Sequence, residues 1–91
     1  MKYFDWDEDK NNLLNETRNI SFEEVILSLG NNKLLDRVEN PYKLKYPNQK
    51  MFIVEIDEYP YIVTFAEDKE KYFLKTIYPS REATKKYLNK E

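Results

Sequence analysis

The feature that most constrains the fold is a set of three apolar runs, separated by short polar turns, in the second half of the chain. The runs span residues 51–56, 61–65 and 72–78. Residues 57–60 and 67–70 lie between them and are mostly charged. Runs of this length, rich in β-branched and aromatic side chains and joined by tight turns, predict an antiparallel meander.

The first third of the chain carries two helix-start signals. Asp7 is an N-cap for a first helix of about 10 residues that begins at Glu8. Ser21 and Glu24 have the spacing of a capping box, which predicts a second helix that ends at Gly30.

The remaining segments complete an α+β fold. Residues 33–38 predict a strand, and Ser80 caps a C-terminal helix that runs to about residue 88. The 91 residues are too few for two independent cores, so residues 1–91 are expected to form a single domain. We predict two N-terminal helices, a four-stranded, largely antiparallel sheet and a C-terminal helix. Phe4 and Trp6 alternate with aspartates and allow one extra short strand at the N-terminus.

Composition excludes several kinds of site. The chain has no His, no Cys and one Gly. This rules out His-based metal sites, thiolate zinc sites, Cys nucleophiles and glycine-rich phosphate loops, so we expect no metal and no cofactor. The N-terminus has no apolar signal-peptide region and no run spans a bilayer, which predicts a cytoplasmic protein with no membrane partner.

Charge is distributed unevenly, although the formal net charge is only −2. Residues 71–91 carry six basic and two acidic side chains, whereas residues 1–40 carry five basic and nine acidic ones. The basic end indicates either an ordinary solvated face or a surface for nucleic acid or an acidic partner. In the second case, the face formed by the C-terminal helix and residues 40–50 should be electropositive.

Four segments carry a resemblance to a known family. They read FDWDEDKN at 4–11, NISFEEV at 19–25, KMFIV at 50–54 and PSREATKK at 79–86. In this order they resemble the BrnT family, the toxins of bacterial type II toxin–antitoxin modules. The chain departs from that family in having Thr17-Arg18-Asn19 where Lys-His-Gly is usual.

The resemblance implies a fold, an activity and a partner. It implies a RelE-like fold, an endoribonuclease that inhibits translation, and neutralisation by a cognate small DNA-binding antitoxin. Such an enzyme uses the 2′-hydroxyl of its RNA substrate as nucleophile. It therefore needs a base, a cation for the phosphorane and an acid for the leaving 5′-oxygen.

Five residues are candidates for this chemistry. Arg81 begins the last helix and is the candidate phosphate ligand, so that Arg81→Ala should abolish toxicity without unfolding the chain. Lys75 is a candidate base and Tyr78 a candidate acid, which act together only if a bulge or Pro79 turns one of them. Glu67 at a turn and Lys10 in the opening motif are further candidates. The alternative for each is an ordinary surface or core-edge contact.

Lysines and tyrosines are interleaved between residues 40 and 50, as in a contact surface for single-stranded RNA. The candidate RNA-binding residues here and in the last helix are Tyr42, Lys43, Lys45, Tyr46, Lys50, Lys85 and Lys86. The loop tyrosines could instead cover the sheet.

Two other functions remain open. One is a catalytically inactive RelE-like module that acts with its antitoxin as a DNA-bound co-repressor, and the other is a small protein–protein adaptor. An enzyme should bring its candidates together in one concave site, whereas an adaptor should lack a basic cleft.

Overall fold

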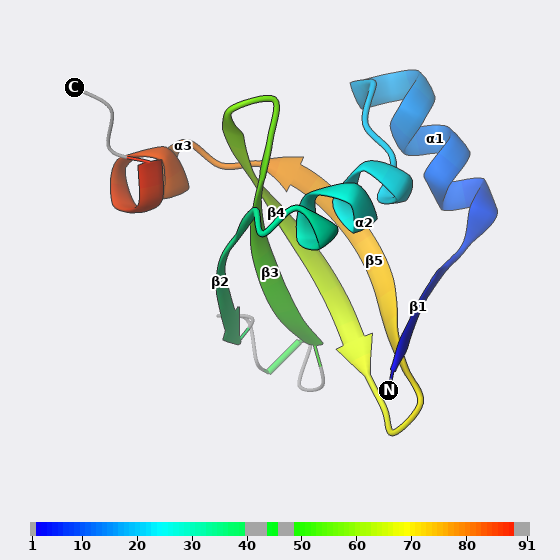
Figure 1. Ribbon diagram of the computed structural model, residues 1–91. Helices are drawn as coiled ribbons and strands as arrows, with labels where there is room; N and C mark the ends of the chain where they lie inside the picture. The colour runs from blue at the N-terminus through cyan, green and yellow to red at the C-terminus, as the bar shows by residue number, and fades with distance from the viewer. Residues whose placement is uncertain (1, 40–43, 46–48, 89–91) are drawn as a thin grey trace.

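The computed structural model describes residues 2–39, 44–45 and 49–88, and over these residues five strands form one curved sheet. The strands are β1 Tyr3–Trp6, β2 Leu34–Glu39, β3 Gln49–Ile56, β4 Tyr59–Glu67 and β5 Lys71–Pro79. Their order across the sheet is β1-β5-β4-β3-β2 (Figure 1). The α+β class is confirmed, and the sheet has five strands rather than four, because the extra N-terminal strand that the sequence allowed is present and pairs in parallel with β5.

The antiparallel meander predicted for the three apolar runs, β3 to β5, is confirmed, and β2 extends it by pairing antiparallel with β3. The turn between β3 and β4 is shorter than the four residues predicted, because Tyr59 and Pro60 already belong to β4. Only Asp57 and Glu58 connect the strands, with φ of 54° and 64°. Two successive positive φ values are typical of the type I′ turn, whose twist matches that of the flanking strands.

Both N-terminal helices have the predicted bounds and caps. Helix α1 spans Glu8–Arg18, and the Asp7 carboxylate accepts a hydrogen bond from the backbone N–H of Asp9. Helix α2 spans Phe22–Gly30 and begins with the complete capping box of Ser21 and Glu24. These side chains satisfy N–H groups that the first turn of a helix leaves without partners.

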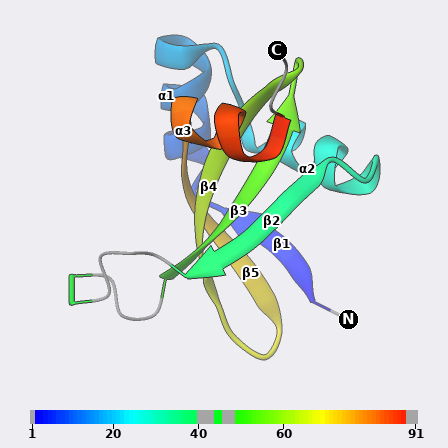
Figure 2. The same ribbon diagram turned by 90° about the vertical axis from the view of Figure 1, so that its left-hand side faces the viewer.

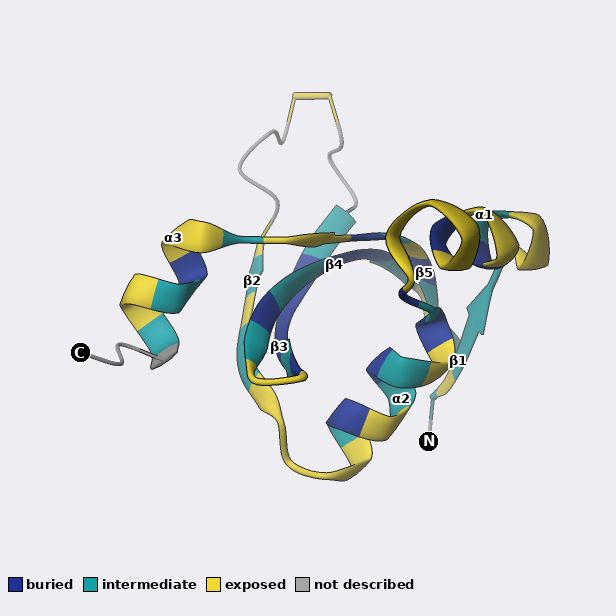
Figure 3. Cartoon of the chain, turned by 90° about the horizontal axis from the view of Figure 1, so that it is seen from above, coloured by how far each residue is buried: buried dark blue, intermediate teal, exposed yellow. Residues whose placement is uncertain are grey.

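The core lies between the helices and one face of the sheet, which we call the helix face. In the view from above, the sheet curls toward the side on which α2 lies (Figure 3). Phe22 and Val25 of α2 are fully buried against sheet residues that include Val54, Phe65 and Ile77. Burial of such side chains is the main favourable term in folding, at roughly 1.5–3 kcal/mol each.

The opposite face of the sheet, the outer face, carries the C-terminal segment (Figure 2). The prediction of one continuous α-helix there is wrong. Helix α3 spans only Arg81–Ala83, with the predicted Ser80 cap, and is followed by a π-helical turn, η1, at Thr84–Leu88. Ala83 is buried, and the Tyr87 hydroxyl donates to Asp36 on β2. The conformation of η1 therefore goes together with contacts to the sheet, which helical periodicity in the sequence does not predict.

A β-bulge interrupts β5. Phe65 pairs with Leu74, but the preceding residue of β4, Thr64, pairs with Thr76, so Lys75 is an additional residue in the strand. Because of this insertion, Leu74 and Ile77 both face the core although they are three residues apart.

Candidate functional site

One carboxylate on the helix face binds three cations from three other parts of the chain. Glu67, the last residue of β4, accepts from Lys2, which precedes β1. It also accepts from Arg37 Nη2 on β2 at 2.5 Å and from Lys50 Nζ on β3 at 3.4 Å. We call these four residues the Glu67 cluster; its formal charge is +2.

The sheet's pairing explains why these side chains meet. Lys50 is paired with Phe65, two residues before Glu67 and on the same face. Arg37 is paired with Phe52 on β3, so its guanidinium reaches across β3 to β4 on the concave side. Curvature of the sheet thus brings together residues from strands that are not direct neighbours.

The cations hold Glu67 in its ionised form. Its side chain is only 16% exposed. The hydrogen bond from Lys2 lowers the pKa of Glu67 most, and the charge of Arg37 lowers it further against the opposing effect of desolvation. Glu67 is consequently a weak base, and its negative charge holds the three surrounding cations close together.

Aromatic rings form the floor beneath this charge. The Arg37 guanidinium carbon lies 6.0 Å, 5.7 Å and 5.8 Å from the ring centres of Phe52, Phe65 and Tyr72. Lys2 Nζ lies 5.3 Å from the centre of the Tyr72 ring. These distances are within the range of cation–π attraction.

A pocket of about 630 Å³ adjoins the cluster on the helix face. It is lined by Phe4, Leu29, Asn32, Leu34, Arg37, Phe52 and Tyr72. Arg37 therefore belongs both to the charged cluster and to this pocket. Excess positive charge beside aromatic faces is the combination that binds the phosphates and bases of a single-stranded nucleic acid.

The structure brings two of the sequence-predicted residues together: Glu67, predicted as catalytic, and Lys50, predicted as RNA-binding. Lys10 is a half-buried residue of α1, and the hydrogen bonds that join Glu67 to Lys2, Arg37 and Lys50 do not include it. Its predicted role stays a prediction.

Arg81 lies at the other end of the molecule from Glu67. It lines a pocket of about 490 Å³ together with Tyr59, the first residue of β4, whereas Glu67 is the last residue of that strand. Eight residue steps at about 3.3 Å separate these ends by roughly 26 Å. Arg81 and Glu67 therefore do not contact the same phosphodiester in this structure.

Lys75 and Tyr78 are on the outer face. Tyr78 is paired with Ile62, which faces away from Glu67, and its hydroxyl lies 3.9 Å from Met51 Sδ. The side chain of Lys75 extends along the same face, with Nζ 4.7 Å from the Phe73 ring centre. The bulge that the sequence argument required is present, but it does not direct either residue to Glu67.

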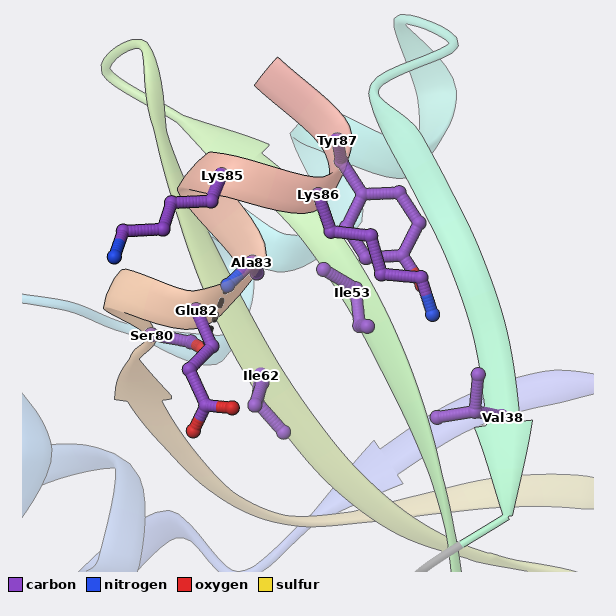
Figure 4. A pocket seen from close by; sticks show the side chains of 9 residues that line it. All are labelled: Val38, Ile53, Ile62, Ser80, Glu82, Ala83, Lys85, Lys86 and Tyr87. Carbon is purple, nitrogen blue, oxygen red and sulfur yellow. Dashed lines mark hydrogen bonds between the residues drawn. The ribbon is translucent and has the colours of Figure 1, made fainter. Parts of the chain in front are cut away.

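The predicted RNA-binding residues are dispersed. Tyr42, Lys43 and Tyr46 lie outside the described residues, and Lys45 is exposed. Lys85 and Lys86 are exposed on η1, beside an outer-face pocket of about 680 Å³ (Figure 4). That pocket has apolar walls from Val38, Ile53 and Ile62. The predicted electropositive surface stays a prediction.

Sequence reasoning missed three residues of the site: Lys2, Arg37 and Tyr72. Arg37 gave little signal, since β2 also carries the charged residues Asp36 and Glu39 and Arg37 does not stand out among them. Lys2 gave none, because its role depends on the parallel pairing of β1 with β5.

The described part of the chain contains no group of three or more acidic or other metal-ligating side chains that could hold a metal ion. Over the same residues, no helix has the length and apolar character needed to cross a membrane. Comparison with protein-family models, curated proteins and solved structures finds no match.

Proposed function

We propose that the chain is an endoribonuclease toxin of a type II toxin–antitoxin module, with a RelE-like fold and its active site at the Glu67 cluster. The observation that carries the proposal is the convergence of Lys2, Arg37 and Lys50 on Glu67 above an aromatic floor. The resemblance of the sequence to the BrnT family supplies the toxin role and the antitoxin partner.

Arg37 is the phosphate ligand in this proposal. Its guanidinium is always charged and matches two phosphate oxygens, so it stabilises the charge that develops on the phosphorane. Lys50 adds a second positive charge from the neighbouring strand. The Tyr72 ring, which stacks on Phe4 and lies within cation–π distance of both Lys2 and Arg37, holds these two cations beside the phosphate.

Glu67 is the general base and Lys2 the general acid in this proposal. Glu67 accepts the proton of the 2′-hydroxyl while that oxygen bonds to phosphorus, and a 2′,3′-cyclic phosphate forms as the bond to the 5′-oxygen breaks. Lys2 donates a proton to the departing 5′-oxygen. The proton on Glu67 then passes to Lys2 along their existing hydrogen bond, and both groups return to their starting forms.

A second candidate, a catalytically inactive module that acts with its antitoxin as a DNA-bound co-repressor, is favoured by one observation. The lowered pKa of Glu67 makes this carboxylate a poor proton acceptor near neutral pH. A site that binds nucleic acid without cleaving it is compatible with the same cluster.

Cleavage of a labelled single-stranded RNA by the purified full chain separates these candidates. The endoribonuclease yields 2′,3′-cyclic phosphate ends and leaves DNA of the same sequence intact, because DNA lacks the nucleophile. Binding without any cleavage, in the presence and absence of ribosomes, would instead support the co-repressor. Induced expression with and without the neighbouring reading frame tests the toxin–antitoxin assignment.

Two arginine variants locate the active site. We predict that Arg37→Ala lowers the cleavage rate about 100- to 1000-fold, the usual loss for one electrostatic contact in the transition state. Arg81→Ala also removes one guanidinium, but at the far end of β4. Full activity of Arg37→Ala together with loss of activity in Arg81→Ala would move the site to α3, as the sequence alone suggested.

A further inference from the structure

We propose that the pocket beside the Glu67 cluster is a nucleobase subsite and that Asn32 reads adenine in it. The inference rests on the proposed function, since it takes RNA as the ligand. It adds something the cluster alone does not provide, namely a preference for one base.

Aromatic and aliphatic side chains line much of the pocket. Phe4 and Tyr72 stack on each other, with ring centres 5.2 Å apart and 27° between their planes, so a base packs beside this pair and not between its rings. Phe52, Leu29 and Leu34 complete the apolar part of the lining, and Leu34 is 43% exposed in the free chain. A volume of about 630 Å³ is within the range of roughly 300–1,000 Å³ that is common for small-ligand sites.

Arg37 fixes which part of an RNA enters the pocket. It contacts Glu67 on one side and lines the pocket on the other. A phosphate held by Arg37 places the adjacent nucleotide at the pocket, where its base packs against the side chains of the lining. Charge complementarity to the phosphate and continuity with the cluster therefore select a nucleotide as the occupant.

Asn32 is the one carboxamide among the residues that line this pocket. It follows the end of α2 with φ of 60°, and its backbone N–H donates to the Leu29 carbonyl at 3.3 Å. The next N–H, of Lys33, donates to the Ser28 carbonyl at 2.9 Å, so the backbone is held on both sides. An asparagine amide donates and accepts at once, which matches the N7 and N6 positions of adenine.

The test compares fluorescent RNA decamers of uridine that carry adenine, guanine, cytosine or uracil at one central position. We expect the adenine oligomer to bind the full chain about 5- to 160-fold more tightly than the others, the range for one good bidentate contact. In Asn32→Gly, which keeps the positive φ without strain, all four oligomers should bind alike. Asn31→Gly is the control, since its φ of −100° is ordinary, and it should retain the preference.

The outcomes separate the subsite from the proposed function. Equal binding of all four oligomers by the unmodified chain overturns the subsite and leaves the RNA site intact. An adenine preference that survives in Asn32→Gly overturns the role of Asn32. Failure to bind any RNA overturns the proposed function and the subsite together.

Discussion

At the scale of single residues, Asn11 joins the two N-terminal helices through a buried amide. Only 5% of Asn11 is exposed. Its Nδ2 donates to Glu23 Oε1 at 2.8 Å, and its Oδ1 accepts from the backbone N–H of Phe22 at 2.8 Å. The amide oxygen therefore supplies an acceptor for the backbone N–H of the first residue of α2. The hydrogen bond from the amide nitrogen is the largest cause of the lowered pKa of Glu23.

We predict that Asn11→Ala lowers the free energy of unfolding by about 1–3 kcal/mol, because it removes hydrogen bonds from buried groups. Urea denaturation measures the loss, with Asn12→Ala as the matched control on the exposed side of α1. The pKa of Glu23, followed by NMR, should rise toward its ordinary value in Asn11→Ala alone. Equal effects of both variants would contradict this role.

Some of the candidate site could be predicted residue by residue, and some could not. Glu67 and Lys50 were each recognisable as charged groups beside strand ends, but nothing in the sequence indicated that they contact each other. Periodicity assigns a residue to a face, whereas the partner of a long side chain depends on sheet order and curvature. For this reason Tyr78 and Glu67 were grouped together, although they lie on opposite faces.

At the scale of elements, the hairpin between β3 and β4 contains avoidable strain. Asp57 and Glu58 both have positive φ, a region that costs L-residues other than Asn, Asp and Gly roughly 1–2 kcal/mol. Asp-Gly is the preferred pair for this turn type.

We predict that Glu58→Gly raises the free energy of unfolding by roughly 0.5–1 kcal/mol, the strain relief less the entropy that glycine adds to the unfolded chain. Lys69→Gly in the turn between β4 and β5 is the control, because Lys69 is not among the described residues with positive φ. It should lower stability by about 0.4–1 kcal/mol. A destabilised Glu58→Gly, measured by thermal melting, would show that strain does not dominate at this turn.

At this scale, prediction succeeded for elements that depend on interactions within a few residues and failed for elements that depend on contacts far apart in the sequence. Helices α1 and α2 were predicted with their caps because Asp7, Ser21 and Glu24 act on backbone groups within a few residues. The π-helical turn η1 was missed because its conformation is tied to contacts with the sheet, such as the hydrogen bond from Tyr87 to Asp36. The parallel pairing of β1 with β5 was missed because its partners are 68 positions apart, as in Tyr3 with Lys71.

At the scale of the whole molecule, stability should depend on carboxylates that are ionised in the folded state. Hydrogen bonds and nearby cations lower the pKa of five of them: Asp5, Glu23, Asp36, Glu67 and Asp68. Because the pKa of each of these carboxyls is lower in the folded state than in the unfolded state, the stabilisation is fully present at pH values above the unfolded pKa. It is lost as pH falls through the folded values.

We therefore predict a nearly constant thermal midpoint around neutral pH and a steady decrease below about pH 5, where the unfolded carboxyls begin to bind protons. Circular dichroism melts across this range measure it. Because the chain has no His, no histidine titration should appear between about pH 5 and 8. A midpoint that rises on acidification would contradict the ion-paired arrangement.

The central claim is that the Glu67 cluster binds an RNA phosphate, and the affinity of one single-stranded RNA for three forms of the chain tests it most directly. Glu67→Gln keeps the side chain's shape but releases Lys2, Arg37 and Lys50 from their internal counter-charge. The account predicts severalfold tighter RNA binding with loss of cleavage in Glu67→Gln. In Arg37→Ala it predicts weaker binding, with a salt dependence reduced by about 0.7 in logarithmic slope. Unchanged affinity in both variants would contradict the account.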